Sequence, residues 1–181
     1  MAVRSTLLHT CSTFNGKDTL PLEALALEHE GDAGYLDAVF GVAEKPASEM
    51  ESIAATWLLL RRFRKDADGA QAHADRLAGL LPGAVHHDAR LHVIQCLDRA
   101  AGGFNAPART RLAKTLRPDL EHDRPFVRAW ALSVLARLAM DTPTIRGWVG
   151  EAIEDAEENG KASLKARVRQ LRCAGALEWY D

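Results

Sequence analysis

The sequence predicts an all-α protein in which helix pairs stack in a row. Alanine and leucine, both strong helix formers, are the commonest residues, with 31 and 24 copies among 181. No window alternates apolar and polar residues with a period of two, so no strand is expected. Short loops join the helical segments, which makes consecutive helices antiparallel. We expect one domain over residues 1–181, in which residues 1–45 form atypical N-terminal capping helices and residues 46–181 form the pairs.

Nine helical segments follow from the spacing of apolar residues and from start and stop signals. They cover residues 20–29, 32–43, 48–68, 70–81, 88–101, 105–117, 125–140, 142–159 and 162–177. The third begins with a capping box, in which Ser48 and Glu51 each accept an N–H that has no helical partner. Single capping side chains are expected at Asp32, Asp88, Asn105 and Asp123. Stop signals stand at Pro82-Gly83, Gly102-Gly103 and Asn159-Gly160.

Apolar residues three or four positions apart give several segments one hydrophobic side. Such stripes occur in the second, third and fifth segments, at Leu36, Val39 and Phe40, at Ile53, Trp57 and Leu60, and at Leu91, Ile94 and Leu97. Pro107 falls in the first turn of the sixth segment, where the missing N–H loses no hydrogen bond. A helix with one apolar side must bury it against a neighbour, so the segments are expected to pack as pairs.

Three of the segments resemble one another. They align on Arg90, Arg128 and Arg167, which are almost evenly spaced along the chain, and apolar or small residues then coincide four and seven positions further on. A partner helix lies between each two of them. The repeating unit is therefore a helix pair of about 38 residues, in the length range of helical repeat families. The repeated arginine is expected to pair with a carboxylate in a turn of the same or the next unit.

The clearest copy spans residues 123–139 and reads Asp-Arg-Pro-Phe-Val-Arg-Ala-Trp-Ala-Leu-Ser-Val-Leu-Ala-Arg-Leu-Ala. It resembles the second half of a HEAT repeat, a family with an Asp and a Pro in the inter-helix turn and a Val-Arg pair one turn later. Asp123, Pro125, Val127 and Arg128 match that pattern. The resemblance implies an α-α superhelix of roughly four to five HEAT-like pairs, whose preformed concave surface binds a protein partner without catalysis.

Charge suggests what kind of partner such a surface would bind. Residues 1–60 hold 3 basic and 9 acidic side chains, whereas residues 61–172 hold 20 basic and 14 acidic ones. Exposed basic side chains on the sixth and ninth segments are the expected contact face for a partner that is itself acidic. These candidate residues are Arg109, Arg111, Lys114, Arg117, Lys165, Arg169 and Arg172.

Nucleic-acid binding is the alternative. HEAT-like alkylpurine DNA glycosylases hold a duplex largely through backbone contacts, and a basic track along the inner curve would suit that role. Trp57, Trp130, Trp148 and Tyr180 would then offer stacking surfaces. Two features favour a protein partner instead: the acidic pI of about 6.4, and the position of Trp57 and Trp130 within apolar stripes.

Catalytic motifs are missing from the sequence. It contains no glycine-rich phosphate loop, no G-x-S-x-G and no H-E-x-x-H, so no cofactor is expected and a protein without enzymatic activity is favoured. An enzyme of unrecognised type that uses the cluster between His86 and His92 stays open as a further alternative. The weak metal candidates are His87, Asp88 and His92, because Asp88 and His92 lie one helical turn apart. The same His-Asp pair recurs at another helix start, at His122-Asp123, which favours a capping role over metal binding.

Three widely spaced cysteines and no C-x-x-C pair suggest a reducing compartment. The N-terminal residues contain no apolar region typical of a secretion signal, and the longest apolar stretch is less than half a membrane span. We therefore expect a cytoplasmic protein that does not enter membranes. The sequence leaves its oligomeric state open.

Overall fold

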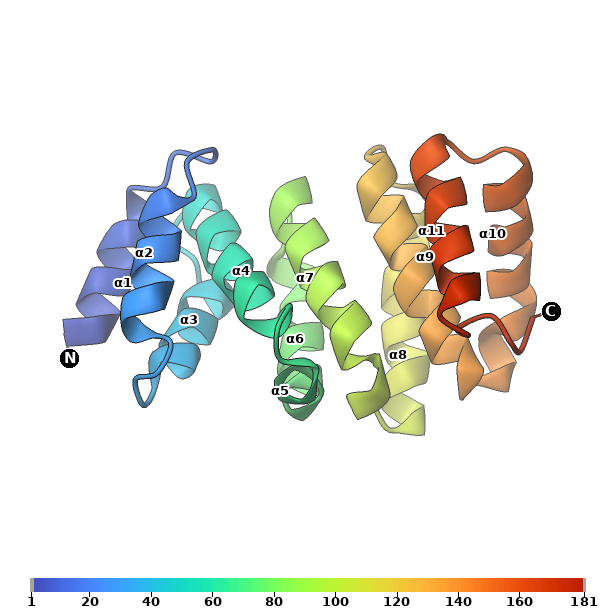
Figure 1. The fold of residues 1–181 in the computed structure, drawn as a ribbon, viewed down its shortest axis with the longest axis horizontal. Coiled ribbons are helices and arrows are strands. Elements are labelled where there is room, and N and C mark those ends of the chain that lie inside the picture. Colours follow the sequence, from blue (N-terminus) through green and yellow to red (C-terminus); the bar gives the residue numbers. More distant parts are fainter. Residues whose placement is uncertain (1, 181) are drawn as a thin grey trace.

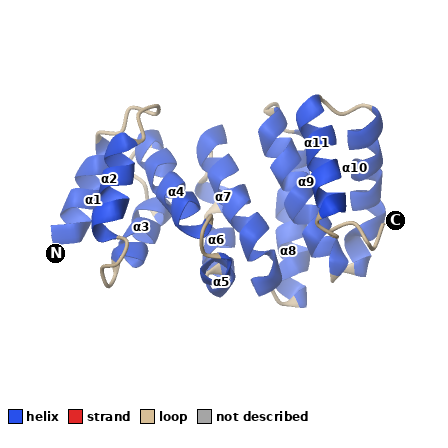
Figure 2. Ribbon diagram, viewed as in Figure 1, coloured by secondary structure: helices blue, strands red, loops and turns tan. Residues whose placement is uncertain are grey.

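The computed structural model describes residues 2–180, and all regular structure in that range is helical (Figure 2), which confirms the predicted all-α class. The α-helices are α1 (Ala2–Ser12), α2 (Leu20–His29), α3 (Tyr35–Glu44), α4 (Glu49–Phe63), α5 (Ala67–Ala72), α6 (Ala74–Gly79), α7 (His87–Ala100), α8 (Ala106–Leu116), α9 (Pro125–Met140), α10 (Arg146–Glu158) and α11 (Ala162–Cys173). Short 3-10 turns are η1 (Leu81–Gly83), η2 (Ala101–Gly103), η3 (Arg117–Glu121) and η4 (Pro143–Ile145). None of these helices has both the length and the apolar character needed to cross a bilayer.

The helices lie in a row, with the N-terminus at one end and the C-terminus at the other (Figure 1). α4, α7, α9 and α11 stand side by side in chain order, and each packs extensively against the next. We call these four helices the front layer. α6 and α8 lie behind it, and α1, α2 and α3 pack against α4 at the N-terminal end. Each further unit therefore lengthens the row by one front helix.

The front-layer helices begin at nearly equal intervals along the chain. Their N-cap residues are Ser48, His86, Arg124 and Lys161. The same interval therefore includes α4, which has no arginine at the position of Arg90 and Arg128. It also corrects the third copy, because Lys165 and not Arg167 lies four residues after its N-cap. The repeat is thus a property of the helix starts.

The core runs continuously between adjacent front helices. α4 and α9 are both largely enclosed, with ten buried residues among 15 in α4 and ten among 16 in α9. Four of the buried residues of α9 are alanines, which allow the neighbouring helices α7 and α11 to approach closely on either side. Trp57 and Trp130 are partly buried against this core, as the apolar stripes predicted.

Two capping predictions are confirmed. Ser48 Oγ accepts the N–H of Glu51 at 3.2 Å, and the Glu51 carboxylate accepts the N–H of Ala47 at 2.7 Å, one residue before the N-cap. Asn105 Oδ1 accepts the N–H of Ala108 at 2.9 Å. Both helices thus begin where the sequence places them.

Of the two helix starts assigned to aspartates, α7 is capped by a histidine, and α9 has no side-chain cap at its N-cap residue Arg124. His86 Nδ1 accepts the N–H of Asp88 at 3.1 Å, and His122 Nδ1 accepts the N–H of Arg124 at 3.0 Å. The predictions of Asp88 and Asp123 as caps are therefore wrong. An imidazole nitrogen can accept the N–H two residues on, much as the oxygen of an Asx turn does.

Several other boundaries differ from those expected. Asp32 accepts a hydrogen bond from His29 Nδ1 at 2.8 Å instead of capping α3, which begins after Gly34 in the left-handed conformation (φ 82°). The expected helix 70–81 divides into α5 and α6 at His73, and the last helix ends at Cys173. α1 was not expected at all.

Arg90 and Arg128 both lie four residues after the N-cap of their helix, and each was predicted to pair with a carboxylate in a turn. The prediction is confirmed for Arg90. Arg90 forms a two-point ion pair with Asp119 in η3, through Nε at 2.5 Å and Nη2 at 2.8 Å, and also donates to the Leu81 carbonyl. Asp119 is only 4% exposed. Arg128 has no such carboxylate, and its buried Nε has no hydrogen-bond partner within residues 2–180. Arg90 thus ties α7 to the turn that leads into α9.

Removing the Asp119 carboxylate should destabilise the stack. Asp119→Ala leaves the Arg90 guanidinium without its anion in a mostly buried site, so we expect the free energy of unfolding in urea to fall by about 3 kcal/mol. Asp123→Ala removes an exposed carboxylate from the same turn region and should change it by less than about 0.5 kcal/mol. Equal losses in the two variants would contradict the structural role of the pair.

Candidate functional site

The seven predicted basic residues do not lie on one surface. Arg109, Arg111 and Lys114 belong to α8, and Arg117 follows in η3, whereas Lys165, Arg169 and Arg172 belong to α11. α8 lies behind the front layer and α11 is part of it (Figure 1). A single partner surface can therefore include only one of the two groups.

Four of these seven side chains bind other parts of the chain. Arg109 pairs with Asp141 at 3.3 Å, and Arg172 pairs with Glu157 at 2.7 Å. Arg117 lies over the Trp148 ring, and Lys165 donates to the Glu158 carbonyl at 3.1 Å. The other three, Arg111, Lys114 and Arg169, are exposed.

A second arginine column was missed by sequence comparison. Arg61, Arg99 and Arg137 are evenly spaced along the chain and occupy the same position in α4, α7 and α9. Arg61 binds the carboxylates of Glu23 and Glu30, and Arg137 Nε donates to the carboxylate of Asp98 at 3.0 Å. Arg99 is exposed and makes no ion pair with any described residue. Since α4, α9 and the helices behind α7 cover its other sides, Arg99 projects from the front layer.

A polar cluster links α7, α9 and α11. Asp98 is 8% exposed, and one of its oxygens accepts hydrogen bonds from Ser133 Oγ at 2.7 Å and from Arg137. Arg167 lies 3.5 Å over the Trp130 ring. Burial lowers the pKa of Arg167, as does the charge of Arg137, while Asp98 raises it. One carboxylate therefore faces two guanidinium groups.

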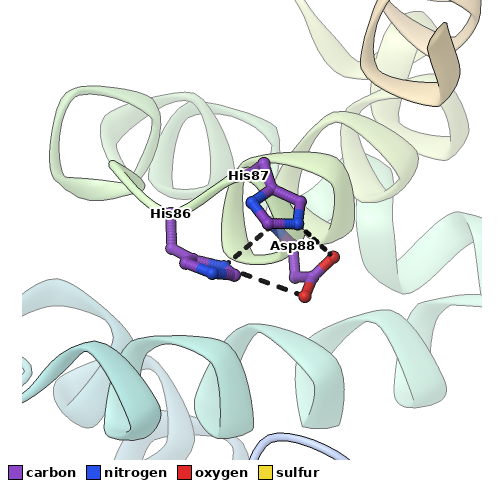
Figure 3. A group of neighbouring side chains, drawn as sticks. All are labelled: His86, His87 and Asp88. Carbon is purple, nitrogen blue, oxygen red and sulfur yellow. Dashed lines mark hydrogen bonds and ion pairs between the residues drawn. The ribbon is translucent and has the colours of Figure 1, made fainter. Parts of the chain in front are cut away.

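The loops that precede α4, α7 and α9 surround a hollow of about 670 Å³. Its lining includes the polar residues Ser48, Glu49, His86, His87, His122 and Arg124 together with apolar ones such as Pro46, Ala47 and Val85. His86 and His87 line this hollow, and Figure 3 shows their side chains close to that of Asp88. One potential ligand atom from each lies within 4.8 Å of the others. This group is where the structure brings candidate metal ligands together.

Hydrogen bonding limits what this group can coordinate. His86 Nδ1 accepts a backbone N–H, so the ring proton of neutral His86 sits on Nε2, which lies 3.4 Å from Glu49 Oε1. His87 Nε2 and the Asp88 carboxylate, 3.4 Å apart, remain available. Desolvation lowers the pKa of His87, which favours its neutral, ligating form. Two free ligands are fewer than the three protein ligands of a catalytic zinc site.

His92, the third sequence candidate, faces α4 rather than this group. Its Nδ1 lies 3.2 Å from Thr56 Oγ1. Because the Thr56 hydroxyl donates to the Ser52 carbonyl at 2.7 Å, His92 Nδ1 is the donor in that contact. Burial lowers the pKa of His92 from 6.5 to about 4. His92 is thus a neutral hydrogen-bonding group between two front helices at neutral pH.

The cysteines are not arranged as nucleophiles. Cys11 and Cys96 are buried, and burial raises the pKa of Cys11 to about 12 and that of Cys96 above its ordinary value. Cys173 is exposed on α11. A thiol becomes reactive where its pKa is lowered, so the two buried cysteines serve as core side chains.

No family model, no curated protein and no solved structure matches this chain. Its function is therefore inferred from the surfaces described above.

The low pKa of His92 predicts an acid-dependent loss of stability. The unfolded chain takes up this proton near pH 6.5 and the folded chain only near pH 4, so protonation favours unfolding. The contribution of His92 is complete above pH 6.5 and falls away as pH drops towards 4, by up to about 3 kcal/mol. His92→Gln, which stays neutral, should flatten the pH dependence of the unfolding free energy in this range.

The matched control is His9→Gln, which removes an exposed histidine of α1. It should leave the pH profile of the unfolding free energy unchanged. A His92→Gln profile parallel to that of the unmodified chain between pH 4 and 6.5 would show that His92 does not cause the acid sensitivity.

Proposed function

We propose that the chain is a non-catalytic, HEAT-like interaction module that binds an acidic segment of a protein partner on its front layer. The regular spacing of the front-layer N-caps supports stacked units of the HEAT type. Such a row presents side chains from several helices on one rigid surface, because each helix is held by its neighbours. Binding then needs little reordering of the module, which reduces the entropy lost on association.

Uncompensated positive charge on the front layer carries this proposal. Arg64 at the end of α4 and Arg99 on α7 are exposed, and neither forms an ion pair with a residue between 2 and 180. Arg167 contacts the Trp130 ring and shares the nearby Asp98 carboxylate with Arg137, but it forms no ion pair within that range. Three guanidinium groups from three front helices are thus available to an acidic partner, and arginine is the basic residue most favoured at interfaces.

A protein is favoured over a nucleic acid as this partner. Phe126 on α9 is 63% exposed and lines the same small hollow as Arg167, and an apolar anchor beside an arginine suits a folded or extended polypeptide. Exposed carboxylates of α10, including Glu151, Glu154 and Asp155, lie next to α11. They would repel a polyanion that continued past the end of the row.

The proposed surface retains part of the face expected from sequence. Lys165, Arg169 and Arg172 belong to the front-layer helix α11 and lie at the end of this surface. Arg111 and Lys114 are exposed on α8, behind the front layer. Substituting them tests which layer binds the partner. The cytoplasmic compartment expected from the cysteines is part of the same proposal.

Charge reversal on the front layer should abolish partner capture. We expect Arg64→Glu with Arg99→Glu to reduce recovery of a specific protein partner from native-organism lysate at least tenfold, because like charges then face its acidic segment. The matched control, Arg111→Glu with Lys114→Glu, makes the same change in net charge on α8. Capture by immobilised protein followed by mass spectrometry measures both.

Two results would contradict the proposal. If the α8 variant loses the partner and the front-layer variant keeps it, the binding surface lies on the other layer. If purified protein shifts random duplex DNA in a gel at low salt, and the front-layer variant does not, nucleic-acid binding replaces protein binding as the function. Thermal unfolding of each variant verifies that the fold is intact.

A further inference from the structure

The contact between α9 and α11 contains a small hollow with an unusual lining. It measures about 170 Å³ and lies among Phe126, Ala129, Trp130, Ser163, Ala166, Arg167 and Gln170. The α9 side of the lining is apolar and aromatic, and the polar side chains come from α11. A cavity of about 150 Å³ can hold a benzene-sized group, so the hollow suits one aromatic or branched aliphatic side chain.

Three polar side chains of α11 border this hollow in a line. Ser163, Arg167 and Gln170 are four and three residues apart, which puts them on one face of the helix. Each carries N–H or O–H donors. Within residues 2–180 neither Ser163 nor Gln170 makes a side-chain hydrogen bond, and the Arg167 guanidinium lies over the Trp130 ring without donating a hydrogen bond. The line is therefore a set of donors without acceptors.

The nearby charges do not balance Arg167. Asp98 is the carboxylate of the cluster, and it is already held by Ser133 and Arg137. Arg137 carries a second positive charge close by, and Arg99 follows Asp98 on α7. The Trp130 ring covers one face of the Arg167 guanidinium at 3.5 Å and leaves its N–H edge unused. A half-buried guanidinium with unused donors binds a carboxylate strongly, because the hydrogen bonds are charge-assisted and partly shielded from water.

We propose that Arg167, flanked by Ser163 and Gln170, binds a carboxylate of an acidic peptide while the hollow beside Trp130 takes the aromatic or branched aliphatic side chain next to it. This inference rests on the proposed function and specifies the recognised motif: an acidic residue adjacent to one bulky apolar residue.

The test uses the full chain and the capped peptide acetyl-Glu-Glu-Phe-Glu-amide as probe. Binding is followed by NMR, through the indole N–H signal of Trp130, identified with Trp130→Phe, and the Nε–H signal of Arg167. We expect both signals to move saturably with peptide concentration. The matched peptide acetyl-Gln-Gln-Phe-Gln-amide, which lacks side-chain carboxylates, should move neither signal.

Variants separate this site from the rest of the front layer. Arg167→Gln should weaken peptide binding at least tenfold, and Arg167→Lys should recover only part of it, because a lysine keeps the charge but lacks the planar pair of donors. Arg111→Gln on α8 should bind as the unmodified chain does. The circular dichroism spectrum and melting temperature of each variant show whether it folds.

Each other outcome overturns a defined part of the inference. If Arg167→Gln binds the peptide normally while Arg64→Glu with Arg99→Glu does not, the front layer binds acidic peptides but this site is wrongly assigned. If inorganic phosphate alone moves both signals as far as the peptide and at the same concentration, the hollow contributes nothing. If neither peptide binds the unmodified chain, the site is refuted, whereas the proposed function is judged separately by partner capture.

Discussion

The close stacking of α4, α7, α9 and α11 is the constraint on which the rest of the structure depends. Each inner helix of this layer is flanked on both sides by another, so the side chains along its flanks must be apolar or small, as the alanines of α9 are. Polar groups that enter a flank need partners there, as Asp98 finds in Ser133 and Arg137. Only the residues that face solvent on each front helix can vary freely in type. The regular interval between helix starts then brings equivalent outward positions into a row, which is how Arg61, Arg99 and Arg137 form a column.

The helical class and most helix positions could be predicted from the sequence, because apolar spacing and composition are properties of each segment alone. Boundaries were harder to predict where two side chains compete for one backbone N–H. Asp88 and Asp123 are residue types typical of caps, yet each directly follows a histidine that takes a backbone N–H instead. His86 Nδ1 accepts the N–H of Asp88 in the first turn of α7, and His122 Nδ1 accepts the N–H of Arg124, just before α9. α1 was missed because its apolar side is short, with Leu7 and Cys11 buried and Leu8 exposed.

Candidate site residues were harder to predict than helices, because their grouping depends on which layer a helix occupies. The basic residues of α8 and α11 are alike in type and spacing, and only the three-dimensional arrangement separates them. The cluster at Asp98 joins three helices that are far apart in the sequence, and no local pattern marks it. The even spacing of Arg61, Arg99 and Arg137 was a usable signal, since it follows once the repeat is extended to α4.

The uneven charge of the sequence has an explanation in the fold. Acidic residues of the N-terminal helices are used internally: Glu23 and Glu30 bind Arg61, while Asp37 and Glu44 bind Arg76. Two carboxylates for each arginine neutralise the start of the row. Towards the C-terminus the ratio reverses, because Asp98 alone faces Arg137 and Arg167, and Arg99 has no partner in the described chain. Positive charge is therefore concentrated on the later front helices, although the molecule as a whole carries a net charge of only −2. A near-neutral protein can in this way present a basic surface on one layer, where an acidic partner would be oriented as well as held.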